Sequence, residues 1–278
     1  MADLPGVVVA MSGGVDSSVA AALLVKQGYP VTGMMLRLWS EPGSKVENRC
    51  CAPEAMVLAR RVAEKLSIPF YVIPAQDVFY TTVIANFITE LSQGLTPNPC
   101  LVCNRLIRWG LLWEQAAAIG ANYLATGHYA RLHRDESGVI QLLRGVDARK
   151  DQSYVLHVLN QQQLEHTMLP LGEFTKPQVR QLARDFALPV AERPDSQDLC
   201  FLGEEDYRSF LLRRAPFAPQ PGPILDRNGQ VLGEHPGLAF FTIGQRKGLG
   251  LSSPHPLYVL EKDLKKNALI VGPGSELG

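Results

Sequence analysis

Hydrophobic and polar positions follow two periods along the first two hundred residues. Short apolar runs, typical of buried strands, alternate with longer stretches in which apolar residues recur every three or four positions, typical of helices. Strands are expected at 7–11, 31–38, 70–73 and 122–126, and helices at 17–27, 52–66, 77–92 and 104–119. This alternation predicts a doubly wound α/β fold, in which helices cover both faces of a parallel sheet and ligands bind at the carboxyl ends of its strands.

Two later stretches depart from this rhythm. Residues 129–134 and 139–144 flank the polar sequence Asp135-Glu136-Ser137-Gly138 and predict a β-hairpin. The proline-rich residues 215–223 indicate a domain boundary. Beyond them, the turn Asp226-Arg227-Asn228-Gly229 and expected strands at 241–243 and 258–260 predict a small β-rich module. The predicted domains are therefore 1–214 and 215–278.

Charge and cysteine content limit the class of protein. Acidic and basic residues number 27 each, which argues against bulk attraction to nucleic acid but leaves room for a local basic patch. Membrane-spanning apolar runs and signal-peptide features are missing from the sequence, so no membrane partner is expected. Five cysteines, an odd number, fit a reducing environment better than a disulfide framework, and the expected location is the cytoplasm.

The strongest chemical signal is Ser12-Gly13-Gly14-Val15-Asp16-Ser17, which lies between a predicted strand and a predicted helix. Glycines permit close approach of the backbone to a ligand, and the unpaired amides of a helix N-terminus suit an anion. The hydroxyls of Ser12, Ser17 and Ser18 can add donors, and the Asp16 carboxylate can bind Mg²⁺. The Walker Gly-Lys-Ser/Thr sequence is lacking. These features favour a phosphate-binding loop over a plain turn with a helix cap.

Three cysteines have neighbours that point to chemistry. Cys103 follows Thr96-Pro97-Asn98-Pro99-Cys100 and precedes a helical pattern, so a helix N-terminus is expected to lower the pKa of its thiol. A structural zinc or redox Cys-x-x-Cys is the alternative, although structural zinc usually needs a second pair. Cys200 would be taken for a core cysteine, but the polar run at 195–198 beside it is not core-like. The adjacent Cys50 and Cys51 have no assigned role.

Six segments occur together and in order: residues 10–17, Thr96 to Asn104, Ala125 to Ala130, Lys150 to Tyr154, Asp195 to Phe201, and Thr242 to Gly248. This set resembles the bacterial tRNA-specific 2-thiouridylases, which belong to the N-type PP-loop ATP pyrophosphatases. The resemblance runs from about Val7 to the end of the chain.

The resemblance implies a two-stage reaction on tRNA. ATP adenylates the C2 oxygen of the wobble uridine, and sulfur then displaces AMP to leave 2-thiouridine. Cys200 matches the cysteine that receives a persulfide sulfur from a relay protein or a cysteine desulfurase. Cys103 matches the nucleophile, which releases that sulfur through a transient disulfide. Such an exchange requires the fold to bring the two thiols to disulfide distance.

The resemblance also implies binding residues. It assigns ATP, with Mg²⁺, to Ala10, Met11, Ser12, Gly13, Gly14, Val15, Asp16, Ser17, Leu36 and Gly127. It assigns the target base to Asn98, Pro99 and Cys100, and the tRNA to His128, Lys150, Asp151 and Gln152. Ala10 replaces a glycine that is common in the family. Without the resemblance, His128 would be interpreted as a core histidine and Lys150 as a surface charge.

Two departures from the family pattern affect the mechanism. Cys100 stands where some members have aspartate, so Cys100, Cys103 and Cys200 together could hold three irons of a four-iron four-sulfur cluster. That cluster route is the alternative to the persulfide route, which we favour slightly. The family's C-terminal β-barrel is absent from this chain, so weaker tRNA affinity than that of a full-length relative is expected.

Two other functions remain alternatives. The first is another PP-loop adenylating ligase or amidotransferase, which would not need the pair Cys103 and Cys200. The second is a non-catalytic RNA-binding remnant, which would bind tRNA without releasing AMP. The intact loop at 12–17 and the retained cysteines argue against a remnant.

Overall fold

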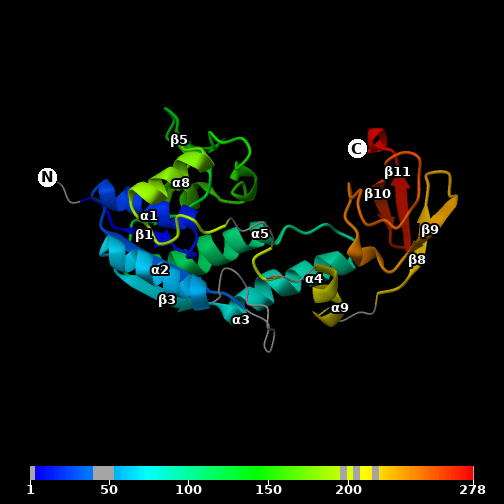
Figure 1. Ribbon diagram of the computed structural model, residues 1–278, viewed down its shortest axis with the longest axis horizontal. Helices are drawn as coiled ribbons and strands as arrows, with labels where there is room; N and C mark the ends of the chain where they lie inside the picture. Colours follow the sequence, from blue (N-terminus) through cyan, green and yellow to red (C-terminus); the bar gives the residue numbers. More distant parts are fainter. Residues whose placement is uncertain (1–3, 40–52, 195–198, 203–206, 215–218, 278) are drawn as a thin grey trace. The chain divides into compact units, whose positions relative to one another are not determined.

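The computed structural model describes residues 4–39, 53–194, 199–202, 207–214 and 219–277. The chain divides into two compact units (Figure 1). The first comprises Met1–Val83 and Pro99–Glu204, and the second comprises Ile84–Asn98 and Glu205–Gly278. This division differs from the domains expected at 1–214 and 215–278, because 84–98 and 205–214 group with the second unit. The proline-rich stretch lies inside that unit.

The first unit contains a five-stranded parallel sheet. Its strands are β1 (Val7–Ala10), β2 (Val31–Arg37), β3 (Phe70–Pro74), β4 (Tyr123–Ala125) and β7 (Thr167–Met168). The strand order is β3-β2-β1-β4-β7, and every neighbouring pair is parallel. The chain leaves the central β1 toward β2 on one side and later returns to β4 on the other. The doubly wound prediction is therefore confirmed, and the order reverses between β1 and β4, where such folds bind ligands.

Alternation along β1 divides the apolar core between the two faces of the sheet. Val7 and Val9 belong to one hydrophobic cluster and Val8 to the other, because successive strand side chains point to opposite faces. Three helices cover the first face: α1 (Val15–Lys26), α2 (Pro53–Leu66) and α8 (Lys176–Asp185). Helix α1 packs between the other two, and it lies beside α8 in Figure 1.

The second face is covered by a helical run from residue 99 to residue 118. It consists of α5 (Pro99–Val102), a π-helical segment (Cys103–Leu112) and α6 (Trp113–Ala118). The run begins five residues earlier than the predicted Asn104, because proline suits the first position of a helix, where no amide partner is needed. The predicted helix at 77–92 forms as α3 (Gln76–Phe79), a π-helical segment (Tyr80–Ile84) and α4 (Ala85–Ser92).

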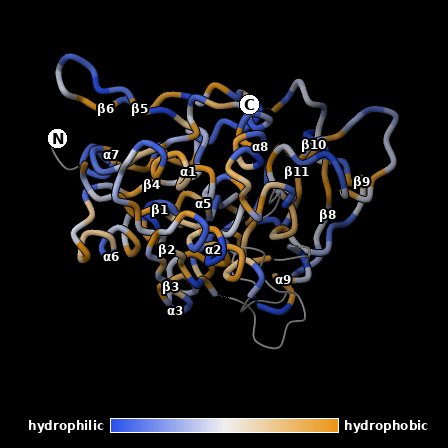
Figure 2. Tube along the Cα trace, turned by 60° about the vertical axis from the view of Figure 1, so that its left-hand side comes forward, coloured by the Kyte–Doolittle hydropathy of each residue, from blue (hydrophilic) through white to orange (hydrophobic). Residues whose placement is uncertain are grey.

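The predicted hairpin forms from β5 (Ala130–Arg134) and β6 (Ile140–Arg144), which pair antiparallel. Its tip is closed by Asp135, whose Oδ1 accepts hydrogen bonds from the backbone amides of Ser137 and Val139. The tip is hydrophilic, and it projects as a blue and white loop in Figure 2. Further short elements are α7 (Gln161–Glu165) and 3₁₀ turns at Ser153–Val155, Leu238–Phe240 and Gly274–Glu276.

The second unit is β-rich, as predicted. It contains α9 (Tyr207–Arg214), β8 (Gly222–Leu225), β9 (Val231–His235), β10 (Tyr258–Asp263) and β11 (Ala268–Gly272). The strand order is β10-β11-β8-β9. The strand expected at 241–243 was wrong, because the Gln245 amide donates to the Thr242 carbonyl at 3.0 Å and the Gln245 side chain accepts from the Thr242 amide, which closes a turn there. Within the described ranges of both units, no helix is long and apolar enough to cross a membrane.

Candidate active site

A cavity of about 270 Å³ lies where the strand order reverses. Its walls come from the residues after β1 and from residues 126–129, which follow β4. Four cationic side chains line it: Arg108, Lys150, Lys176 and Arg193. Asp16 is the only carboxylate among the described lining residues. The surplus of positive charge suits a polyanionic ligand such as a nucleoside triphosphate.

The loop at residues 12–17 is held by its own hydroxyl groups. Ser17 Oγ accepts a hydrogen bond from the Ser12 amide at 3.1 Å, and Ser18 Oγ donates to the Gly14 carbonyl at 2.8 Å. Ser18 is fully buried, so its hydroxyl braces the loop and does not line the cavity, contrary to the expectation that it would donate to a ligand. Gly14 precedes α1, and the first amides of that helix have no intrahelical acceptor.

Glycine at position 13 is required by the packing of the loop. Gly13 has a positive φ of 68°, and a Cβ there would lie 2.2 Å from the Ala55 carbonyl oxygen in α2. Gly127 is equally confined, because its Cβ would lie 2.7 Å from the backbone carbonyl carbon of Asp16 and 2.7 Å from the Ser17 nitrogen. The segment after β4 therefore packs directly on the start of α1.

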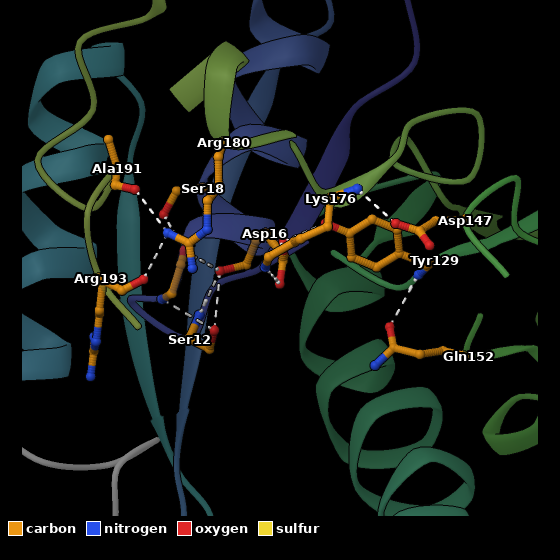
Figure 3. A network of polar contacts seen from close by, with 12 residues as sticks. Ser12, Asp16, Ser18, Tyr129, Asp147, Gln152, Lys176, Arg180, Ala191 and Arg193 are labelled. Atoms are coloured by element: carbon orange, nitrogen blue, oxygen red, sulfur yellow. Dashed lines mark hydrogen bonds and ion pairs between the residues drawn. The ribbon is translucent and has the colours of Figure 1, made fainter. Parts of the chain in front are cut away.

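The Asp16 carboxylate is the centre of a polar network (Figure 3). Lys176 Nζ lies 2.7 Å from Asp16 Oδ1 and 2.8 Å from Oδ2, and the Tyr129 hydroxyl donates to Oδ1 at 2.7 Å. The Lys176 side chain is 11% exposed and that of Asp16 is 34% exposed. The carboxylate therefore faces the cavity while both of its oxygens are engaged.

Lys176 is positioned by the beginning of α8. Its backbone amide donates to Asp147 Oδ2 at 2.9 Å, and this hydrogen bond is the main reason that the pKa of Asp147 lies below its usual value. Gln178 Oε1 accepts from the Thr175 amide at 2.8 Å and completes a capping arrangement at the same helix end. Lys176 was not among the predicted site residues. The one sequence feature that could have indicated it is its position as the first residue of a capped helix.

Arg193 ties the chain after α8 to the loop. Its NH1 donates to the Gly13 carbonyl at 2.6 Å. Arg180 of α8 in turn donates to the carbonyls of Ala191 and Arg193, each at 3.0 Å (Figure 3). Arg193 was also missed by the sequence analysis, because a lone arginine in a loop carries no pattern.

His128 is buried beside Arg108. Because a guanidinium only donates, the 3.4 Å contact from Arg108 NH1 makes His128 Nε2 the acceptor and leaves the proton on Nδ1, which lies 2.7 Å from Thr126 Oγ1. Burial, followed by the nearby charge of Arg108, lowers the pKa of His128 to about 3. The ring is therefore neutral at physiological pH.

The segment at 150–152 contributes two side chains to the cavity, Lys150 and Gln152. Gln152 Oε1 accepts from the Tyr129 amide at 3.1 Å, and the Gln152 amide donates to the Tyr129 carbonyl. Asp151 instead turns toward its own loop, where its carboxylate accepts from the Gly145 amide and the Ser153 hydroxyl. This aspartate braces the segment that presents its two neighbours.

Comparisons with known proteins agree with this geometry. A family model described as tRNA methyl transferase HUP domain matches residues 5–204, and one described as tRNA methyl transferase PRC-barrel domain matches residues 208–273. The chain is 52% identical to the tRNA-specific 2-thiouridylase MnmA of Moorella thermoacetica over 272 residues, which cover 97% of this chain and 76% of the relative.

The chain belongs to the tRNA-specific 2-thiouridylase family.

A second relative, the MnmA of Heliobacterium modesticaldum, is 50% identical over 96% of this chain and 70% of its own length. The descriptions of the family models name a methyl transferase, whereas these relatives are named as thiouridylases. We assign the chain to the thiouridylases, because about half of the positions aligned with these relatives are identical. Among solved structures, NMN synthetase from Francisella tularensis is 20% identical over 75% of this chain and 72% of its own, with a TM-score of 0.43, too distant to bear on function.

Of the remaining nucleotide positions expected for a thiouridylase, one lines the cavity and two do not. Ala10 ends β1 and lines it, while Met11 is buried behind the loop. Leu36 lies on β2, opposite Ile73 of β3, and is partly buried against the second core cluster. The assignment of Leu36 to adenine stays a prediction.

The three chemically interesting cysteines differ in burial. Cys100 is exposed on α5, Cys103 is 7% exposed, and Cys200 is half-buried. Because the helix begins at Pro99, Cys103 lies beyond its first turn, where the effect of the helix dipole on a thiol fades. Cys103 thus lies near the start of the helical run, as expected, but Cys100 is the cysteine in its first turn, and the lowered pKa of the Cys103 thiol stays a prediction.

Helix α3 links the two cysteine segments. Phe201, the neighbour of Cys200, packs edge-on against Phe79 of α3 with 6.3 Å between ring centroids. The same helix packs on the π-helical segment that begins with Cys103. Both cysteine-bearing segments therefore contact α3, although Cys103 and Cys200 lie almost a hundred residues apart in the sequence.

Some predicted features fall outside the described residues. These are Cys50, Cys51 and the polar run at 195–198. Within the ranges that the structure covers, no three histidine, cysteine or acidic side chains gather as a metal site. The trio Cys100, Cys103 and Cys200 thus has no clustered arrangement among the side chains described, and no reaction step is derived through an iron–sulfur cluster.

Proposed function

We propose that this protein is an ATP-dependent tRNA 2-thiouridylase, which adenylates the C2 oxygen of a wobble uridine and then replaces that oxygen with sulfur. One observation carries the proposal. A single helical run supplies both Cys103 and Arg108, and Arg108 lines the cavity beside the PP-loop. One helical run therefore carries both the thiol of the sulfur step and a cation of the pocket for the adenylation step.

The cavity offers what a triphosphate needs. The loop after β1 presents the amides of the α1 N-terminus, and Lys176 and Arg193, which bond to Asp16 and Gly13 of that loop, add positive charge beside them. Attack of the C2 oxygen on the α-phosphorus would release pyrophosphate, whose charge these cations offset. Asp16 faces the cavity and is an oxygen ligand of the kind that Mg²⁺ prefers. It would hold the ion, which shields the phosphate charge, once Lys176, here bonded to both of its oxygens, turns to the phosphates.

Arg108 is the residue best placed to act between the two steps. Its guanidinium is held by Asn104 Oδ1 at 2.7 Å and by His128 Nε2, and Asn104 follows Cys103 directly. A cation fixed in this way can stabilise negative charge on the adenylated base or its phosphate. His128 is neutral and acts by holding Arg108; a general acid at neutral pH would need a pKa near 7.

The sulfur step follows from thiol chemistry. The Cys103 thiolate attacks Sγ of the Cys200 persulfide, the sulfur–sulfur bond of the persulfide breaks, and the terminal sulfur leaves with the electron pair as hydrosulfide. Hydrosulfide attacks C2 of the base, AMP departs with the former oxygen, and loss of the remaining sulfur-bound proton gives the thiocarbonyl. The Cys103–Cys200 disulfide is then reduced by an external thiol.

The partners follow from this chemistry. A persulfide-donating relay protein or a cysteine desulfurase would load Cys200, and the reaction would take place in the cytoplasm. The target base would lie near Asn98, Pro99 and Cys100, and Lys150, Gln152 and the surroundings of His128 would contact the tRNA. Exposure of Cys100 and the cationic lining of the cavity support this assignment.

The deciding experiment supplies an unmodified tRNA transcript with a wobble uridine, ATP, Mg²⁺ and sulfide under anaerobic conditions. The tRNA is then digested and 2-thiouridine is measured by mass spectrometry, with pyrophosphate release followed in parallel as the readout of adenylation. Wild-type protein should form 2-thiouridine, and with a persulfide donor in place of sulfide, Cys103→Ser and Cys200→Ser should release pyrophosphate but form no thiolated product. A wild type that yields neither pyrophosphate nor 2-thiouridine overturns the proposal.

A further inference from the structure

The sequence Thr242-Ile243-Gly244-Gln245-Arg246-Lys247-Gly248 has no part in the reaction described above. It belongs to the second unit and lies in the connection between the 3₁₀ turn at Leu238–Phe240 and β10. We call residues 242–257 the basic loop. A hollow of about 350 Å³ opens within it, lined among others by Arg246, Ser253 and His255.

Gln245 fixes the backbone of the basic loop. Its Oε1 accepts from the Thr242 amide at 3.1 Å, and its Nε2 donates to the Lys247 carbonyl at 2.8 Å. Its backbone carbonyl accepts from the Val259 amide at 2.9 Å. The side chain and backbone of Gln245 therefore hold the turn from Thr242 to Lys247 in place. The side chains of Arg246 and Lys247 stay exposed.

The glycines of the loop leave one side of its backbone open. Gly244, Gly248 and Gly250 have positive φ angles of 82°, 76° and 71°, which favour glycine. An added Cβ at Gly244 or Gly250 would meet no atom within 4 Å. Internal packing therefore does not fill the space beside these glycines, and a ligand could approach the backbone closely there.

Positive charge gathers at the same place. Arg208 of α9 donates to the Gly248 carbonyl at 3.3 Å, and its guanidinium lies 5.4 Å from the ring centre of Phe241. Residues 242–257 contain Arg246, Lys247 and His255 and no aspartate or glutamate, whereas the chain as a whole has zero net charge. Cations, a hydroxyl and exposed backbone, in a loop whose own sequence has no acidic residue, are the groups that bind phosphate.

We infer that the basic loop is a second RNA contact, which binds the sugar–phosphate backbone of the tRNA whose wobble base is modified in the first unit. The inference rests on the proposed function, because that function supplies the polyanion. Contacts of this kind fix the register of an RNA without reading its sequence. The loop is therefore a positioning surface and takes no part in the chemistry.

The test compares two double variants in the same unit. Arg246→Ala with Lys247→Ala should weaken binding of an unmodified tRNA transcript about tenfold at moderate salt and should reduce the slope of log affinity against log salt by about 2. Lys265→Ala with Lys266→Ala removes the same charge from the turn between β10 and β11, also at exposed positions, and should change both quantities much less. Equal effects of the two double variants would overturn the inference.

A footprint on the wild-type protein avoids any effect of substitution on folding. Lysine acetylation read by mass spectrometry should show Lys247 protected by tRNA, with Lys265 unprotected as the internal control. Inorganic phosphate at the same phosphate concentration should not protect Lys247 to the same degree, since a continuous backbone supplies several contacts at once. Stronger or equal protection by inorganic phosphate would assign the hollow to a small anion and overturn the RNA contact.

Failure of this inference and failure of the proposed function have different signatures. If the wild type thiolates tRNA while the Arg246/Lys247 variant keeps wild-type affinity and salt dependence, only the loop contact is overturned. If the wild type does not bind tRNA, both are overturned. Rescue of affinity by Arg246→Lys with Lys247→Arg, which keeps both charges, would show that charge and not a particular side-chain geometry is recognised.

Discussion

The ammonium group of Lys176 lies between 2.7 and 2.8 Å from the two carboxylate oxygens of Asp16, and so joins two helices whose contact residues are 160 positions apart. The pair neutralises Asp16, the one carboxylate among the described residues that line the cavity. Because the Asp16 side chain is 34% exposed, water screens this ion pair, and its main effect is on the charge of the site and not on stability.

Lys176→Gln should remove most of the adenylation activity. We expect about a hundredfold loss in kcat/KM for ATP, the usual effect of losing one preorganised donor to developing charge. Stability should change by only about 1 kcal/mol, because the exposed Asp16 carboxylate remains hydrated. Pyrophosphate release in the presence of tRNA checks the rate, and Lys65→Gln, an exposed lysine in the last turn of α2, is the matched control. Equal activity of both variants would contradict the role of Lys176.

Gly127→Ala should separate the two loops that form the nucleotide pocket. The new methyl would lie 2.7 Å from backbone atoms of Asp16 and Ser17, so one segment must shift, at about 1–3 kcal/mol. ATP affinity measured by calorimetry should fall about tenfold or more for that cost. Gly6→Ala is the control, since its Cβ would meet its nearest neighbour at an ordinary 3.7 Å. Unchanged affinity in the Gly127 variant would show that the segment after β4 does not bound the pocket.

His128 should make stability depend on pH below neutrality. Its pKa is about 3 in the folded protein and near 6.5 when unfolded, so between these values the unfolded chain binds the extra proton and stability falls as pH falls. From pH 7.5 to pH 5.5 this loss amounts to about 1.4 kcal/mol.

His128→Asn removes that titrating group. Urea unfolding at both pH values should show that the stability advantage of the wild type over the variant shrinks by about this 1.4 kcal/mol at the lower pH. An advantage that is the same at both pH values would mean that His128 is solvated and titrates normally.

Phe79→Leu tests whether α3 aligns the two thiols. Phe79 is 1% exposed and touches Phe201, so the smaller side chain should cost about 1–3 kcal/mol and loosen the segment that carries Cys200. Thiolation from a persulfide donor should fall more than pyrophosphate release, because only the sulfur step needs the two thiols to meet. Phe87→Leu, a buried phenylalanine of the second unit, is the control. An equal loss in both steps would assign Phe79 to general stability.

Cys100→Ser separates the two sulfur routes. In the persulfide route only Cys103 and Cys200 exchange sulfur, so the variant should retain most of its thiolation activity. A cluster route needs three thiolates, and would lose both its iron and its activity in this variant. Iron and sulfide analysis after anaerobic purification, set beside the 2-thiouridine yield, gives the answer; loss of activity together with loss of iron would contradict the persulfide route.

Periodicity was enough to predict most elements of the first unit. The valines of β1 and the amphipathic α2 follow their expected spacing, because strand and helix geometry impose periods that a single sequence displays. The strand expected at 241–243 failed because the side chain of Gln245 competes for the Thr242 amide, and such a local hydrogen bond leaves no mark on the hydrophobic pattern. The start at Pro99 was missed for a related reason, since proline can either break or begin a helix.

The sequence by itself predicted a phosphate-binding loop at 12–17 and singled out Cys100, Cys103 and Cys200, because glycine spacing and thiol-bearing segments are local properties of the chain. Only the tertiary structure decided which cations meet the loop. Lys176 and Arg193 reach it from α8 and the residues after it, and Arg108 reaches it from the opposite face of the sheet. The three cations converge because the strand order places β1 beside β4. Strand order is set by packing between residues far apart in the sequence, so no local sequence pattern reveals it.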